Sequence, residues 1–185
     1  MTSPTEIANR ALQCLGDTPI LDITDNNERA RIMRRAYEPV RKAELRKHIW
    51  NFARKRVVLA PDSVAPAFGF AYAYTWPGDC LRVFPQRCAR DWTVEGRKIL
   101  TDDGPSLELI YISDVTDVNT MDDMFVEAFA KKLAVETAEK VTQSTSKREL
   151  AQAEYKEAMA EARKVGAFEQ IPQEFPTDDW LLARY

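Results

Sequence analysis

Apolar residues recur at helical spacing near both ends of the chain. Stripes of apolar residues three or four positions apart occupy residues 7–15, 33–40, 125–141 and 150–162. This period places the apolar side chains on one face of a helix, so four helices are predicted. Ser3 and Pro4 favour the start of the first helix, and Gly16 favours its end.

The middle of the chain follows a different pattern. After Trp50 and Phe52 the residues favour an extended backbone up to Leu59, and aromatic residues occupy every second position from Phe68 to Trp76. A period of two is typical of a strand with one buried face. Residues 92–95 and 98–100 flank Gly96-Arg97 as a hairpin would, and residues 107–112 form a further strand. These segments predict a small antiparallel sheet, with Trp50 and Phe52 tying it to the helices.

Helices on both sides of a strand-rich middle predict an α+β fold. We expect an antiparallel helical bundle with a small antiparallel β-sheet inserted between the second and third helices, followed by an extended C-terminal tail. Residues 1–50 and 119–166 are assigned to the helical bundle, 51–118 to the inserted β-rich subdomain and 167–185 to the tail. The length of 185 residues fits one domain with an insertion.

The stretch from Arg29 to Arg56 is strongly basic, although the chain as a whole has a formal net charge of -3. One interpretation is a nucleic-acid-binding helical module. The other is a helix whose arginines pair with carboxylates in the same chain or in a partner. We expect the second, because a dedicated nucleic-acid binder is usually basic overall. The basic residues are Arg29, Arg31, Arg34, Arg35, Arg41, Lys42, Arg46, Lys47, Arg54, Lys55 and Arg56, which face only Glu38 and Glu44.

The last residues differ from everything before them. Pro172 and Pro176 interrupt helical structure and keep the chain extended. The short turn predicted at 177–182 is marginal in water unless a groove orders it. We expect this tail to dock on a partner, the alternative being that it folds back onto its own bundle. The residues assigned to partner contacts are Arg34, Arg35, Arg41, Arg46, Phe168, Phe175, Trp180, Leu181 and Leu182.

Residues that would support catalysis are sparse. His48 is the only histidine, and the three cysteines, Cys14, Cys80 and Cys88, have no metal-ligand spacing. The acid pairs 102–103 and 122–123 precede a predicted turn or helix start, where acids are favoured without catalysis. We therefore expect no enzyme, no cofactor and no metal. No apolar run approaches the length of a membrane span, so no membrane partner is expected.

Several short segments, in order along most of the chain, carry a family resemblance. Trp-Asn-Phe-Ala beside an Arg-rich helix, followed by Pro-Gly-Asp-Cys-Leu-Arg, is the most specific combination. On these segments the chain resembles the tail tubular protein A family of short-tailed bacteriophages, the adaptor between portal and tail nozzle. The segments are residues 11–16, 36–41, 48–53, 72–74, 77–82, 111–117 and 179–184.

The resemblance implies a structural virion protein. Members of this family form a twelve-subunit ring that binds the portal protein and the tail nozzle protein. Genomic DNA passes through the lumen of such a ring without tight binding. The implied location is the virion tail, with assembly in the host cytoplasm, and the family has no catalytic residues to transfer. The alternative, a nucleic-acid-binding module on residues 29–56, differs in predicting an affinity that falls steeply with salt.

Overall fold

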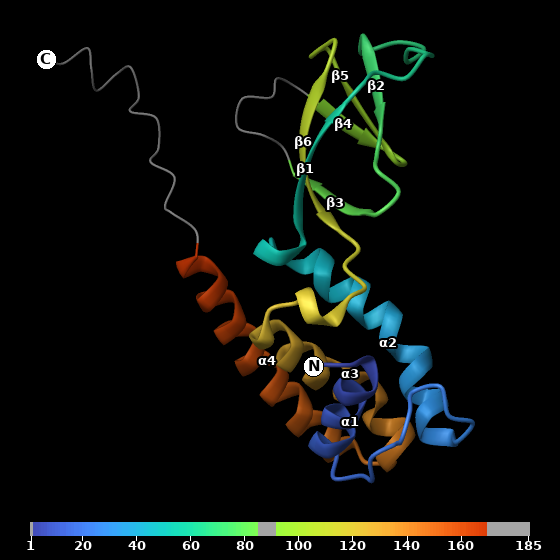
Figure 1. The fold of residues 1–185 in the computed structure, drawn as a ribbon, viewed down its shortest axis with the longest axis vertical. Coiled ribbons are helices and arrows are strands. Elements are labelled where there is room, and N and C mark those ends of the chain that lie inside the picture. The colour runs from blue at the N-terminus through green and yellow to red at the C-terminus, as the bar shows by residue number, and fades with distance from the viewer. Residues whose placement is uncertain (1, 85–91, 170–185) are drawn as a thin grey trace, which may run out of the picture.

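The computed structural model describes residues 2–84 and 92–169 of the chain. Figure 1 shows a helical lobe and a β lobe at opposite ends of the long axis. This arrangement confirms the mixed α+β class. The elements in chain order are α1 (Pro4–Cys14), α2 (Glu28–Lys47), η1 (Asn51–Ala53), β1 (Arg54–Leu59), β2 (Tyr72–Thr75), β3 (Cys80–Phe84), β4 (Trp92–Glu95), β5 (Lys98–Thr101), β6 (Leu107–Ser113), η2 (Val118–Thr120), α3 (Asp123–Thr142) and α4 (Thr145–Phe168).

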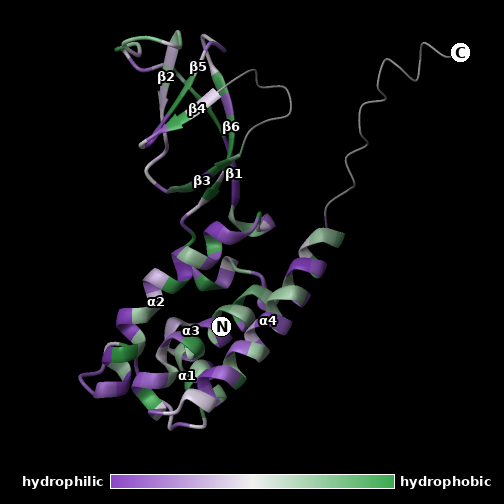
Figure 2. Ribbon diagram, turned by 180° about the vertical axis from the view of Figure 1, so that it is seen from behind, coloured by the Kyte–Doolittle hydropathy of each residue, from purple (hydrophilic) through white to green (hydrophobic). Residues whose placement is uncertain are grey.

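Helix α3 is the centre of the helical lobe. It packs against α1, α2 and α4, and it carries apolar residues on several sides, as expected for a helix surrounded by others. Phe125, Phe129 and Leu133 are fully buried there. In both views α2 and α4 lie on opposite sides of this centre (Figure 1, Figure 2). The lobe therefore exposes one outer face of α2 and one outer face of α4.

The helix ends follow local chemistry. The Ser3 hydroxyl accepts a hydrogen bond from the Glu6 N–H at 3.1 Å, and the Asn27 side chain caps α2 in the same way. Gly16 has φ +66° directly after the first helix, a conformation that glycine adopts without steric penalty. Helix α4 continues to Phe168. The helix therefore runs two residues past residue 166, the predicted end of the helical bundle.

The strands form two antiparallel three-stranded sheets, with orders β1-β6-β3 and β2-β5-β4. The prediction of a single sheet is wrong. The hairpin of β4 and β5 is confirmed, but β2 pairs with β5 and not with a sequence neighbour. Residues of both sheets form one apolar cluster that includes Tyr74, Ile99 and Leu109. Burying this cluster stabilises the two-sheet arrangement, and local spacing does not encode it.

The predicted aromatic strand is shorter than expected. Only Tyr72–Thr75 is a strand, and Phe68 is 88% exposed. Gly69, at φ +89°, takes a backbone conformation outside the extended region, so the pairing begins only after it. Tyr74 is fully buried, so this aromatic belongs to the core, as expected.

Aromatic rings join the two lobes. The Trp50 and Phe52 rings lie 4.8 and 5.1 Å from the Phe125 ring, measured between centroids. The Trp50 indole N–H donates to the Glu44 carbonyl at 3.1 Å. The predicted role of Trp50 and Phe52 as ties between helix and sheet is confirmed, with the 3-10 turn η1 between α2 and β1.

Candidate interaction surfaces

A row of basic side chains follows the outer face of α2. Arg31, Arg35, Lys42 and Arg46 lie on one helical stripe, which also carries the exposed acid Glu38 between Arg35 and Lys42. The opposite stripe, with Met33, is buried in the bundle. Figure 2 shows hydrophilic residues along most of α2. We call these four residues the basic ridge.

The basic surface continues onto the sheet. The Arg82 guanidinium donates to the Arg46 carbonyl at 3.0 Å. Arg82 and Arg54 are both register partners of Ile112, so they lie on the same sheet face. Arg56 follows Arg54 at strand period and points to that face too. Basic side chains therefore extend from the helical lobe to the β lobe.

Some basic side chains of this stretch form ion pairs with carboxylates of the same chain, as the second interpretation of the basic stretch expects. The Arg29 and Asp17 side chains lie 2.7 Å apart, and those of Lys55 and Asp79 lie 2.8 Å apart. Among the described residues, no carboxylate pairs with Arg35 or with the other arginines of the basic ridge. Within residues 2–84 and 92–169 these arginines therefore have no acidic partner and can pair with one on another subunit. Between residues that the structure describes, the ion pairs of this stretch are Arg29–Asp17, Arg41–Asp114, Lys42–Asp114, Lys47–Glu44 and Lys55–Asp79.

Arg41 does not belong to this surface. Its side chain is 2% exposed and lies 2.5 Å from the Asp114 carboxylate, and it also donates to the Val115 carbonyl. The assignment of Arg41 to a partner contact is therefore corrected: the side chain joins α2 to the segment after β6. The sequence contains a sign of this burial, because Arg41 stands four residues after the buried Tyr37 and so lies on the same helix face.

The other predicted contact residues are distributed unevenly. Arg34 is exposed and donates to the Thr24 carbonyl at 3.2 Å, while Arg35 and Arg46 are exposed on the basic ridge. Phe168 is 88% exposed at the end of α4. Four others, Phe175, Trp180, Leu181 and Leu182, lie outside the described residues.

Glu44, one of the two acids within the basic stretch, is a buried carboxylate. It is fully buried. The Tyr155 hydroxyl donates to it at 2.8 Å and the Lys47 ammonium at 2.5 Å. Burial raises the pKa of Tyr155. This group of side chains joins α2 to α4. The helical spacing again indicated the burial, because Glu44 stands four residues after the buried Val40.

Helix α4 exposes a stripe of opposite charge. Leu150, Glu154, Glu157 and Glu161 are separated by four, three and four residues and so share one stripe, which ends at the exposed cation Lys164. Leu150 is 60% exposed. Within the described residues no cation pairs with Glu157 or Glu161. Tyr155, which reaches α2, falls on the other side of the helix, so this acidic stripe faces away from α2.

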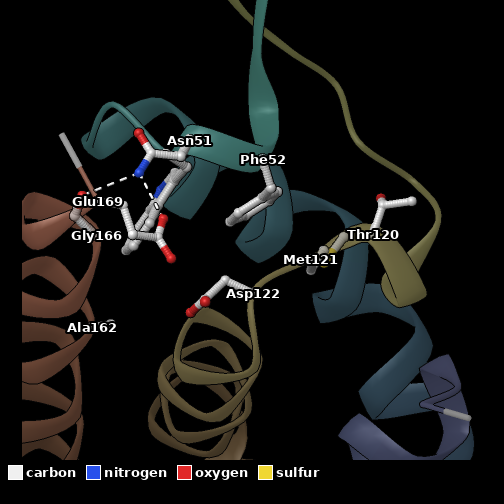
Figure 3. Close-up of a pocket in the computed structure, with 9 residues that line it drawn as sticks. Asn51, Phe52, Thr120, Met121, Asp122, Ala162, Gly166 and Glu169 are labelled. Atoms are coloured by element: carbon white, nitrogen blue, oxygen red, sulfur yellow. Dashed lines mark hydrogen bonds between the residues drawn. The ribbon is translucent and has the colours of Figure 1, made fainter. Parts of the chain in front are cut away.

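A small pocket lies where the lobes meet (Figure 3). It measures about 210 Å³ and is lined by residues of η1, η2 and α4. The Asn51 amide donates to the Gly166 carbonyl at 3.1 Å and to the Glu169 carboxylate at 2.8 Å. The Asp122 carboxylate accepts the N–H groups at the start of α3, so it acts as a helix cap. The two hydrogen bonds of Asn51 thus hold the end of α4 beside the start of β1.

A second, more apolar cleft of about 320 Å³ lies on the sheet that contains β1. Val58, which lines this cleft, is 66% exposed. The lining residues are Arg56, Val57, Val58, Glu108, Leu109 and Ile110.

His48 is expected to make stability depend on pH. Burial and the nearby Arg163 cation lower the pKa of His48 from its ordinary value of 6.5. As the pH falls, the unfolded chain binds this proton before the folded chain does. The stabilisation is therefore complete above about pH 6.5 and is lost as the pH falls below it. Urea unfolding of His48→Gln between pH 7.5 and 5 should show a weaker decline than wild type, and an equal decline would contradict the assignment.

Two findings limit the chemistry of the residues that the structure describes. No group of three or more His, Cys, Asp or Glu side chains among residues 2–84 and 92–169 is placed to hold a metal ion. No helix in these ranges is both long enough and apolar enough to cross a membrane.

Comparison of the chain with known proteins adds no identification. No protein-family model matches it, and no curated protein matches it. The function is therefore argued from the surfaces described above.

Proposed function

We propose that this protein is a structural subunit that assembles head to tail into a ring. The observation that carries the proposal is the pair of complementary stripes, the basic ridge on α2 and the acidic stripe on α4, two helices that lie on opposite sides of α3. A head-to-tail contact needs two different faces on each subunit, and it forms a ring when the rotation between subunits closes.

The stripes set the register and orientation of such a contact more than its strength. An exposed ion pair contributes only about 0–1 kcal/mol, whereas charge complementarity suppresses wrong partners. Burial of Leu150, now 60% exposed, adds an apolar part to the interface. A stable contact is expected to bury more than about 1,000 Å² in total.

Together with the family resemblance, this geometry supports a head-to-tail adaptor in the virion of a short-tailed bacteriophage. In this proposal twelve copies form a ring between the portal protein and the tail nozzle protein. The genome leaves through the lumen, and the protein carries out no catalytic step. Assembly takes place in the host cytoplasm and the ring remains in the virion tail. Cryo-electron microscopy of the tail checks this proposal, and a single peripheral copy would contradict it.

Reversing the charge of the acidic stripe is expected to reduce ring formation. The double variant Glu157→Lys, Glu161→Lys should weaken subunit association by about tenfold or more, which corresponds to about 1.4 kcal/mol. Adding Arg35→Glu and Arg46→Glu to the same chain should restore it, because the two faces again carry opposite charges. Mass photometry with purified portal measures the ring fraction.

The matched control is Glu95→Lys, an exposed acid in the β4–β5 hairpin far from both stripes. It should leave assembly unchanged. Equal loss of assembly in the control, or no restoration by the fourfold exchange, would count against the proposed interface.

A second candidate function is contact with nucleic acid. It is favoured by the continuation of basic side chains from α2 onto the sheet through Arg82, Arg54 and Arg56. A surface that binds phosphates loses affinity steeply as salt rises, with a slope set by the number of phosphates neutralised. Titrating labelled duplex DNA at several salt concentrations therefore separates the two functions. The adaptor proposal expects weak binding to DNA by the free subunit.

A further inference from the structure

Strand β1 is an edge strand with an unusual exposed face. In its sheet β1 pairs only with β6, and no other described strand lies on its second edge. Such an edge presents unpaired N–H and C=O groups that attract another extended chain. Arg54, Arg56 and Val58 alternate along β1 and therefore point to one face. Val58 is 66% exposed there.

The cleft of about 320 Å³ adjoins this edge. Val57, Val58, Leu109 and Ile110 supply its apolar part, and its lining carries one cation, Arg56 on β1, and one carboxylate, Glu108 on β6. A strand added to this edge lies next to Arg56, whereas Glu108 is one strand further away. The added segment is therefore favoured by an acidic side chain beside Arg56 and, two residues later, a large apolar one beside Val58. Strand addition of this kind takes its affinity from main-chain hydrogen bonds and its specificity from alternate side chains.

The chain itself contains such a segment. Residues 177–185 read Thr-Asp-Asp-Trp-Leu-Leu-Ala-Arg-Tyr. We propose that this segment docks on the β1 edge of its own subunit as a parallel strand. In this register Asp178 lies beside Arg56, Trp180 beside Val58 and Leu182 beside Ala60. The acid and the aromatic then meet the cation and the apolar part of the cleft in the required order.

The end of α4 sets this direction. Asn51, three residues before β1, holds Gly166 and Glu169 through its amide, as Figure 3 shows. The chain from Glu169 to Asp178 spans up to about 30 Å, since an extended residue covers about 3.3–3.6 Å. The path from Asn51 to Arg56 is at most about 17 Å at about 3.3 Å per residue, since the 3-10 turn η1 shortens it. The segment therefore reaches the β1 edge without strain while running in the same direction as β1.

Two further features favour this occupant. Pro172 and Pro176 lie before the docking residues, so their missing N–H groups take no part in the strand ladder. Attachment to the same chain also raises the effective concentration of the segment to the millimolar range. This proposal selects the second alternative for the tail, contact with its own subunit, and places that contact on the β lobe rather than the bundle.

Disulfide trapping in the full-length chain tests the proposal. Ala60→Cys and Leu182→Cys are introduced together with Cys14→Ser, which leaves Asp178, Trp180, Arg56 and Val58 in place. Adjacent strands lie about 4.8 Å apart, within the range that a disulfide bridges. Mild oxidation is expected to give a disulfide between residues 60 and 182 within one chain, identified by tryptic mass spectrometry. The control pair, Val94→Cys with Leu182→Cys, is expected to give none.

Substitutions in the cleft sharpen the test. Val58→Asp should lower the yield of the disulfide between residues 60 and 182 by about tenfold, the scale of a weakened anchor contact, while Val94→Asp, also at an exposed valine, should not. Arg56→Glu should lower the yield, and Asp178→Lys in the same chain should restore it. The charge exchange between residues 56 and 178 does not involve Val58, so it tests the proposal even where Val58→Asp fails to fold.

Three results would overturn the proposal. They are no disulfide between residues 60 and 182, a disulfide found only between two chains, and a yield unaffected by Val58→Asp and by the charge exchange. The proposal concerns the free subunit and is independent of the ring. Loss of the ring with a retained disulfide would contradict the proposed function alone, and the reverse result would contradict only this docking.

Discussion

Replacement of Phe125 by alanine is expected to lower the free energy of unfolding by about 4 kcal/mol, the scale measured for buried phenylalanines. Phe125 is fully buried. Its ring contacts those of Trp50 and Phe52, with centroids 4.8 and 5.1 Å away, and the Phe129 ring at 6.1 Å. The substitution removes the ring around which η1 and α3 pack, and the fixed backbone of the bundle cannot fully close the space. Urea unfolding measures the change.

Phe168→Ala is the matched control for this prediction. Phe168 is 88% exposed, so its truncation should change the stability of the free subunit by no more than about 0.5 kcal/mol. Equal effects of the two substitutions would show that the aromatic junction does not stabilise the subunit. A selective loss of amide exchange protection in β1 and η1 of Phe125→Ala would further support a coupling of the lobes through this ring.

Arg41→Ala is expected to lower the free energy of unfolding by about 3 kcal/mol, as removal of one partner of a buried ion pair does. The Arg41 side chain is 2% exposed and Asp114 is 21% exposed. The substitution leaves the Asp114 carboxylate and the Val115 carbonyl without this donor and opens space inside the helical lobe. Because Asp114 retains some contact with water, the loss should fall at the lower end of the range for buried pairs.

Lys42→Ala provides the comparison, because Lys42 lies 3.4 Å from the same carboxylate but is 45% exposed. Its loss should be below about 1 kcal/mol, as for exposed pairs. A loss in Arg41→Ala no larger than in Lys42→Ala would contradict the structural role of Arg41. Arg41 and Arg46 were both assigned to partner contacts from the sequence. We now expect a substitution of Arg41 to lower the stability of the fold and a substitution of Arg46, on the basic ridge, to weaken assembly.

Local features of the sequence were sufficient to predict the helices and several of their ends. Ser3 and Asn27 cap helices as side chains of their type do, and Gly16 follows the first helix in a left-handed conformation. The α+β class and the β4–β5 hairpin were also predictable. These features depend on residues within a few positions of one another, so the sequence alone contains the relevant interactions.

Charged residues inside the helical lobe were less predictable. The basic stretch was recognised, but its composition does not separate Arg41 and Glu44, which are buried, from Arg35 and Arg46, which are exposed. The helical phase contained that information, yet burial of a charge becomes favourable only when a partner such as Asp114 or Tyr155 arrives from a distant segment.

The sequence by itself therefore determined the class of fold, the helix caps, the aromatic junction and the presence of a basic helix. Only the tertiary structure decided that the strands divide into two sheets, that β1 remains at an edge beside an apolar cleft, and that the helices with the basic and acidic stripes lie on opposite sides of α3. The physical reason is that period and propensity report which face of an element is apolar. The partner of that face depends on the total area buried when segments far apart in the chain pack together.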